Sequence, residues 1–124
     1  MPDVTGFSTL HALNRENVKL YVPKTPGCYV LDRDRTGGFE VYYTGRADYD
    51  LEERLCSWVE KGYLFFKFLQ LPDRKSAYEM ECKVYHNLRP ADNKMHPDAP
   101  DNTSYTCPFC PKQNSDFYRQ LFGR

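Results

Sequence analysis

Three runs of apolar and aromatic residues along the chain have the length of β-strands. Residues 27–31 and 39–44 form the first two, and a polar turn that contains two glycines joins them. Because glycine accepts positive φ angles and so suits tight turns, these two runs predict a β-hairpin. The third run, residues 63–71, comes directly before Pro72. Proline has no backbone N–H, so it ends this third predicted strand.

Two further stretches have the apolar periodicity of helices. The first begins at Asp50, where the sequence has a capping-box pattern, and it extends to about Lys61. Gly62 is a suitable C-terminal stop. The second covers residues 76–88. Stepping about 100° per residue gathers the apolar side chains of this helix on one face, and Glu81 falls in the middle of that face.

The two ends of the chain are less regular. Ser8 is a candidate N-cap for a short helix, and residues 18–22 suggest an extended piece over a sheet edge. Residues 91–116 contain four of the prolines, so we expect a loop that is ordered only where something holds it. Residues 117–122 favour a final helical turn. The expected divisions are an N-terminal extension, a central core and a C-terminal extension packed on that core: residues 1–23, 24–95 and 96–124.

Composition limits the function without deciding it. A chain of 124 residues predicts one domain with a modest core. The 17 basic and 17 acidic residues balance, so any site for a polyanion has to be a local patch. Five cysteines, an odd number, fit reduced thiols or a metal better than a disulfide framework. Because the chain has no apolar leader and no run of about 18 apolar residues, we expect a cytoplasmic protein.

Glu81 is the first candidate for chemistry. A carboxylate in the apolar stripe of a helix is costly unless it is paired or bound to a cation. Two interpretations are open: a buried salt bridge to an arginine such as Arg54, or a ligand for a hard cation such as Mg²⁺.

Two tyrosines and two arginines could complete such a site. Tyr29 and Tyr43 belong to the predicted hairpin, and Arg46 and Arg54 follow it. Each alone is more often a packing or surface residue. Together, the arginines could clamp a phosphate and neutralise charge in a transition state. Positive charge nearby would also lower the pKa of a phenol, which could then orient or deprotonate a water molecule.

In this order the residues resemble the motifs of the GIY-YIG nuclease family. Residues 27–29, Gly-Cys-Tyr, stand where the family has Gly-Ile-Tyr, and residues 43–45, Tyr-Thr-Gly, where it has Tyr-Ile-Gly. Residues 46–47 resemble its basic-residue-plus-alanine step, and residues 51–55 its Leu-x-x-Arg-hydrophobe helix. The later helix resembles the family's glutamate helix at Glu81, Val84, Tyr85, Pro90 and Asn93.

The resemblance implies an α+β fold, with a small three-stranded antiparallel sheet flanked by helices. It also implies cleavage of nucleic-acid phosphodiesters with one divalent metal, Mg²⁺ or Mn²⁺. Carried over to this chain, Glu81 would bind the metal and Arg54 the scissile phosphate. Tyr43 would activate water, and Tyr29 would support the nucleophile or the phosphate. The full catalytic set implied is Tyr29, Tyr43, Arg46, Arg54, Glu81 and Asn93.

The chain departs from the family pattern in a few places. Arg46 replaces the commoner lysine, and Asn93 is expected to stabilise the site. The segment from Gly45 to Arg54 is acidic, with Asp48, Asp50, Glu52 and Glu53. Carboxylates are unfavourable beside a polyanion. A second interpretation is therefore a weak or inactive module that keeps the fold and binds nucleic acid or protein.

The cysteines and histidines give a separate hypothesis. Cys82 and His86 are one helical turn apart and point the same way, and Cys107 and Cys110 form a C-x₂-C pair. This set suits a tetrahedral structural Zn²⁺, with His96 as the alternative nitrogen ligand. Zinc would clip the C-terminal extension to the outer face of the second long helix. Inert core thiols beside a loose tail, or a redox pair, are the other interpretations.

The function expected from the sequence is a stand-alone endonuclease that hydrolyses DNA with the help of a metal. So short a chain leaves little room for a separate recognition domain. Sequence specificity would then come from loops, from a homodimer or from a partner protein. The strandedness of the substrate, the choice between DNA and RNA, and the biological process stay open.

Overall fold

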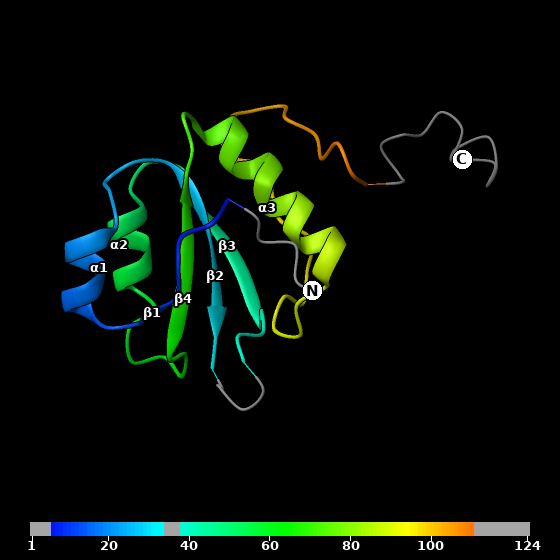
Figure 1. Ribbon diagram of the computed structural model, residues 1–124. Helices are drawn as coiled ribbons and strands as arrows, with labels where there is room; N and C mark the ends of the chain where they lie inside the picture. Colours follow the sequence, from blue (N-terminus) through cyan, green and yellow to red (C-terminus); the bar gives the residue numbers. More distant parts are fainter. Residues whose placement is uncertain (1–5, 34–37, 111–124) are drawn as a thin grey trace.

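The structure is a computed structural model that describes residues 6–33 and 38–110. Its centre is a four-stranded antiparallel sheet with the strand order β1-β4-β2-β3. Within the described residues, α1 and α2 cover one face of the sheet and α3 covers the other (Figure 1). In chain order the elements are β1 (His11–Ala12), α1 (Arg15–Tyr21), β2 (Gly27–Asp32), β3 (Tyr43–Ala47), α2 (Leu51–Cys56), β4 (Phe65–Gln70) and α3 (Arg74–Leu88).

The central strand β2 contributes side chains to both layers of the fold. Tyr29 and Leu31 are buried in the core under α1 and α2, together with Leu51 of α2. Val30 lies on the opposite face, where it packs with Val84 of α3. Successive residues of a strand point to opposite sides of a sheet, so one buried strand supports helices on both faces. The predicted α+β class is confirmed.

The sheet has four strands rather than the three expected. The additional strand β1 has two residues and pairs with β4, and so short a stretch carries no periodicity that a sequence pattern could show. The second predicted strand, residues 39–44, is also displaced: β3 begins at Tyr43, continues through Gly45 and ends at Ala47. It pairs antiparallel with β2, as a hairpin requires. Gly45 therefore lies inside the strand and does not end it.

The two longer predicted helices form, with different ends. α2 ends at Cys56, before the predicted end near residue 61, and turns lead from it to Gly62, whose φ is +101°. Asp50 caps α2 as predicted, because its side chain accepts a hydrogen bond from the backbone N–H three residues later. α3 begins at Arg74, two residues before the predicted start, because Asp73 caps it in the same way.

Two expectations for the N-terminal region are wrong. Ser8 caps no helix; its hydroxyl accepts a hydrogen bond from the backbone N–H of Phe68 on β4. The first helix instead follows Asn14, whose side chain accepts from the N–H of Asn17. Residues 18–21, expected to be extended, belong to this helix. Helical geometry there buries Val18 completely in the core under α1 and α2, which an extended piece over the sheet edge would not do.

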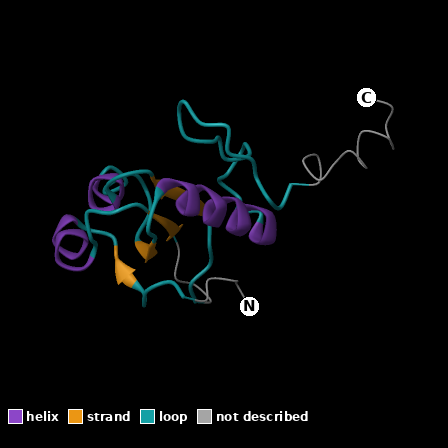
Figure 2. Cartoon of the chain, turned by 90° about the horizontal axis from the view of Figure 1, so that it is seen from above, coloured by secondary structure: helices purple, strands orange, loops and turns teal. Residues whose placement is uncertain are grey.

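The segment after α3 has no helix or strand as far as residue 110. Cys107 of this segment packs with Cys82 and Tyr78 on α3. Figure 2 shows the segment as a loop beside this helix. The predicted helical turn at residues 117–122 lies outside the described residues. In the part of the chain that the structure describes, no helix has the length and apolar character needed to cross a membrane.

Candidate active site

A pocket of about 210 Å³ lies where β2, β3, α2 and α3 meet. Its lining consists of Tyr29, Tyr43, Gly45, Arg46, Asp48, Arg54, Trp58, Glu81 and Asp98. Five of the six residues predicted for catalysis therefore surround one cavity, although they come from four separate elements. The sixth, Asn93, does not line it. This arrangement allows the predicted roles, which remain predictions.

Tyr29 is fixed at the base of the pocket by close packing and one hydrogen bond. Only 2 % of this residue is exposed. Its ring crosses the backbone of Gly45 so closely that a Cβ atom on Gly45 would lie 2.5 Å from the phenolic oxygen. The indole Nε1–H of Trp58 donates a hydrogen bond of 2.7 Å to the same oxygen. The hydroxyl of Tyr29 can still donate its own proton toward the pocket.

Glu81 is a buried carboxylate that is paired with Arg46. Only 7 % of Glu81 is exposed. Arg46 Nη1 donates a hydrogen bond of 2.8 Å to Glu81 Oε1, and Arg46 Nε donates one of 2.7 Å to Asp48 Oδ1. The salt-bridge partner suggested by the sequence, Arg54, is thus the wrong arginine. Arg46 is next to Glu81 because β3 packs on α3, whereas Arg54 lies on the exposed side of α2.

Burial raises the pKa of the Glu81 carboxyl from its ordinary value of 4.5 to about 7, although the charge and hydrogen bond of Arg46 act in the opposite direction. The charged carboxylate of Glu81 loses its hydrating water in the pocket. The guanidinium of Arg46, which is shared with Asp48, does not fully replace that solvation. A second positive charge would therefore be bound favourably beside Glu81.

The pKa values of the two tyrosines differ from the expectation. Positive charge was expected to lower them, but burial raises the pKa of Tyr29 and of Tyr43, and the opposing effect of Arg54 is smaller. A phenolate is disfavoured where little water can solvate it. Without a bound cation, both hydroxyls are protonated at neutral pH and act as hydrogen-bond donors.

Arg54 connects this pocket to a larger and more acidic one. The neighbouring cavity has a volume of about 460 Å³ and includes Arg54, Asp48, Asp50 and Glu53 in its lining. Arg54 is exposed, so its guanidinium can reach a ligand in either cavity. Three carboxylates of the acidic rim predicted from the sequence thus line this cavity, whereas Glu52 is buried and pairs with Lys24.

Asn93 supports the site from outside the pocket. Its side-chain oxygen accepts a hydrogen bond of 2.8 Å from the backbone N–H of Thr44, and its amide donates one of 3.0 Å to the carbonyl of the same residue. Thr44 lies between Tyr43 and Gly45 in β3. Asn93 therefore holds the strand segment that positions one of the two tyrosines.

Two residues of the pocket escaped the sequence reasoning. The sequence pattern placed Trp58 on the apolar face of the predicted helix but did not indicate that it donates a hydrogen bond to Tyr29. The available signal was its indole N–H, because a buried indole N–H usually has a hydrogen-bond partner. Asp98 comes from the proline-rich segment after α3. No local pattern connects that segment with Glu81, because only the path of the chain brings the two together.

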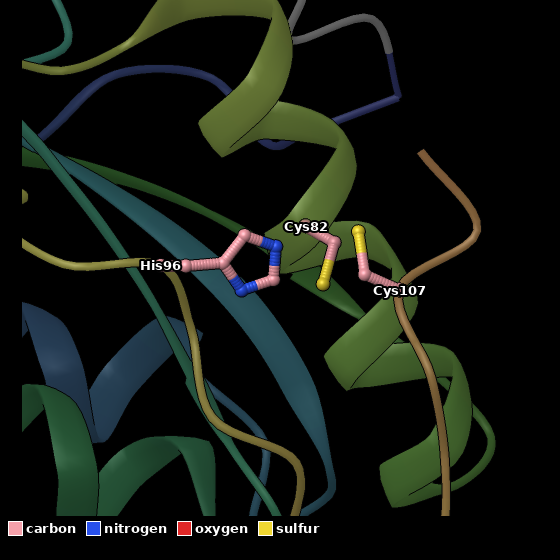
Figure 3. A group of neighbouring side chains, drawn as sticks. All are labelled: Cys82, His96 and Cys107. Atoms are coloured by element: carbon pink, nitrogen blue, oxygen red, sulfur yellow. The ribbon is translucent and has the colours of Figure 1, made fainter. Parts of the chain in front are cut away.

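A group of cysteine and histidine side chains lies beside the pocket, on α3 and the segment that follows. The ligand atoms of Cys82, His96 and Cys107 all lie within 4.8 Å of one another (Figure 3). A second group, with the same limit, contains His86, His96 and Cys110. These groups could hold a metal ion such as zinc.

The zinc ligands predicted from the sequence stay a prediction, and the structure distributes them over two groups. Among the described residues, the expected set of Cys82, His86, Cys107 and Cys110 does not form a single group. His96, the alternative nitrogen ligand, belongs to both groups. His96 lies on the loop after α3, between the helix and the C-terminal segment. The spacing of residues along α3 could not predict where this loop places its imidazole.

The comparison with solved structures identifies the fold. The chain is similar to the N-terminal GIY-YIG endonuclease domain of UvrC from Thermotoga maritima, whose crystal structure contains its catalytic divalent cation, magnesium. The TM-score is 0.50 at 21 % identity, and the match covers 62 % of this chain and 91 % of that domain. No protein-family model and no curated protein matches the sequence. The fold is thus GIY-YIG-like, as the sequence motifs predicted.

Proposed function

We propose that the chain is a divalent-metal-dependent endonuclease that hydrolyses phosphodiester bonds in nucleic acid, with DNA as the expected substrate. The observation that carries this proposal is the burial of Glu81 in one pocket with Tyr29, Tyr43 and Arg54. A buried carboxylate with a raised pKa in a polar cleft is a common sign of a functional site. The GIY-YIG-like fold supports the same assignment.

The donor set of the pocket fits Mg²⁺ or Mn²⁺. Glu81 would hold the ion, and the carboxylates of Asp48 and Asp98 line the same cavity. Magnesium is typically bound by one or two carboxylates and keeps several waters, some of which substrate phosphate oxygens replace. Such an ion would stabilise negative charge on the phosphate and lower the pKa of water.

The protein side chains then have distinct roles. Arg54, exposed and free to reach the groove, binds the scissile phosphate and offsets the charge that develops in the transition state. Tyr43, at the pocket wall, orients the water that attacks the phosphorus, and Tyr29 donates a hydrogen bond from the pocket base. Arg46 is a positioning residue, because its contacts go to Glu81 and Asp48.

A cleavage assay with matched variants tests this function. The full chain is incubated with supercoiled plasmid, single-stranded DNA and RNA, with Mg²⁺, with Mn²⁺ or with EDTA. We expect metal-dependent nicking that Glu81→Ala and Arg54→Ala each reduce by about 100-fold or more. Glu79→Ala, on the same helix but outside the pocket, is the matched control and should cleave like the wild type.

Binding of the ion provides a readout that does not depend on activity. Mg²⁺ should raise the melting temperature of the wild type and of Glu79→Ala, but not that of Glu81→Ala. Absence of cleavage on all three substrates by folded protein that binds Mg²⁺ would contradict the enzyme assignment. Equal cleavage by Glu81→Ala would contradict the role of this residue.

The second candidate is a module that binds nucleic acid or protein without cutting. The observation that favours it is the acidic lining of the larger cavity, with Asp48, Asp50 and Glu53 around Arg54. These carboxylates weaken the attraction of a polyanion. A homodimer or a partner protein could supply the missing positive surface in either case, and retained binding without cleavage in the assay above would select this candidate.

A further inference from the structure

We propose that Cys82, His96, Cys107 and Cys110 bind a structural zinc ion that fastens the segment after α3 to that helix. The ligands come from three places: Cys82 from α3, His96 from the loop that follows it, and the two other cysteines from the C-terminal segment. The inference does not rest on nuclease activity, because all four residues lie outside the lining of the candidate active site.

The distances bring three of the four ligands close to one tetrahedral ion, and Cys110 lies within the same 4.8 Å limit of His96 alone among them. With zinc–sulfur bonds of about 2.3 Å and zinc–nitrogen bonds of about 2.0 Å, ligand atoms around a tetrahedral zinc are roughly 3.3–3.8 Å apart. Cys82, His96 and Cys107 already have their ligand atoms within 4.8 Å of one another. Three soft or borderline ligands so close together need only small side-chain adjustments to share an ion.

Hydrogen bonds around the group prepare these ligands. His96 Nδ1 lies 2.7 Å from the carbonyl oxygen of Pro97, and because a carbonyl only accepts, Nδ1 carries a proton. In the neutral ring Nε2 then has the lone pair, which faces His86 Nε2 at 3.2 Å and which a metal would take instead. The imidazole of His96 points toward the thiols of Cys82 and Cys107 (Figure 3). The backbone N–H of Phe109 donates to Cys107 Sγ at 3.4 Å, which stabilises sulfur in its thiolate form. Outer contacts of this kind are usual around bound zinc.

Cys110 is the fourth ligand in this proposal, and His86 is its competitor. Both have their ligand atoms within 4.8 Å of that of His96. Cys110 shares a C-x₂-C turn with Cys107, a spacing that often places two thiolates on one zinc. His86 is held by α3, with its Nε2 3.2 Å from that of His96.

The site would also shape one wall of the active-site groove. Asp98 lies two residues after His96 and lines the pocket that contains Glu81, and Ala99 packs against the cysteine cluster. The neighbouring residue of Glu81 in α3 is Cys82. An ion at this place would therefore fix the segment from residue 96 to residue 101 against the helix that carries the buried carboxylate.

Metal analysis of the full-length protein tests the proposal. The chain is expressed without added zinc, purified under reducing conditions and analysed by mass spectrometry for metals. We expect about one zinc ion per chain in the wild type, and nearly complete loss in Cys107→Ser, Cys110→Ser and His96→Gln. Cys56→Ser, which alters a cysteine of α2 outside the group, should keep its zinc.

Cobalt substitution identifies the ligands even if a variant is unstable. The Co²⁺ form of the wild type should show the visible absorption of a tetrahedral ion with three thiolates, and His86→Gln should leave this spectrum unchanged. Loss of the spectrum in His86→Gln, with its retention in Cys110→Ser, would overturn the ligand set. Wild-type protein without zinc, or with a disulfide between Cys82 and Cys107, would overturn the proposal itself.

Discussion

At the scale of single residues, two glycines owe their identity to the space around their backbone. A Cβ atom on Gly27 would lie 2.4 Å from Leu51 Cδ1 and 2.4 Å from the carbonyl oxygen of Leu69. A Cβ atom on Gly45 would meet the hydroxyl of Tyr29 at 2.5 Å. Contacts this short force a displacement of the neighbours. Gly27 lets α2 pack on the sheet, and Gly45 makes room for the tyrosine at the base of the pocket.

Glu81 leads to a prediction about pH and stability at the same scale. Its pKa is about 7 in the folded protein, above its ordinary value of 4.5, so the folded state holds the proton more tightly than the unfolded state. The stability that comes from this group is complete at low pH and is lost as the pH rises from 4.5 through about 7. Relative to Glu81→Gln, the free energy of unfolding of the metal-free wild type should fall by about 3 kcal/mol.

Denaturant unfolding of both proteins across this pH range, with EDTA present, measures the difference. Other titrating groups are common to the two proteins and cancel. If the unfolding free energy of the wild type minus that of Glu81→Gln stayed constant or increased with pH, Glu81 would not be protonated near neutrality. Addition of Mg²⁺ above pH 7 should restore stability to the wild type alone, because the ion neutralises the buried carboxylate.

At the scale of elements, the site depends on the free edge of β3. This strand is the last in the order β1-β4-β2-β3, so among residues 6–33 and 38–110 its outer backbone groups have no strand partner. The loop after α3 supplies one: Asn93 bonds both backbone groups of Thr44, and the N–H of Asp92 donates to the carbonyl of Tyr42. These contacts protect the first part of the edge from pairing with another chain.

Asn93→Ala should loosen this edge without unfolding the protein. Two hydrogen bonds to Thr44 are lost, so we expect a decrease of about 1–3 kcal/mol in the free energy of unfolding. The amide proton of Thr44 should exchange with solvent markedly faster, which nuclear magnetic resonance measures directly. Lys94→Ala, at the exposed next residue, is the control. Unchanged exchange at Thr44 in Asn93→Ala would show that water or another group replaces the side chain.

At the scale of the whole molecule, charge limits how the groove can bind a polyanion. The chain has 17 basic and 17 acidic residues, so attraction has to come from local arginines. Arg54 lines the larger cavity together with Asp50 and Glu53, and Arg46 is already paired with two carboxylates. The expected result is weak binding with little preference for sequence.

Removing one acid from the groove should strengthen binding. We expect Glu53→Gln to bind a short oligonucleotide about three- to five-fold more tightly at low salt, since a carboxylate near a phosphate costs up to about 1 kcal/mol there. The gain should disappear as salt screens the charges. Glu16→Gln on α1 changes the net charge equally but lies outside the groove. Equal gains in fluorescence-anisotropy titrations of the two variants would show that only the net charge matters.

Much of the fold could be predicted from local patterns. The helix that begins after Asp50, the long helix around Glu81 and the pairing of β2 with β3 all follow from periodicity, caps and turn residues. The ends of elements were harder to predict. Gly45 lies inside β3, where the ring of Tyr29 occupies the place of a side chain, and no local rule for glycine would indicate this.

The sequence by itself determined the α+β class, the order of the motifs and the placement of a carboxylate on the buried face of α3. These properties depend on neighbours within a few residues, and such neighbours are visible in a sequence. Only the tertiary structure decided that Arg46 rather than Arg54 pairs with Glu81, that His96 joins the cysteines, and that Asp98 reaches the pocket. Each of these depends on how separate elements pack together, because packing brings distant residues within reach of one another.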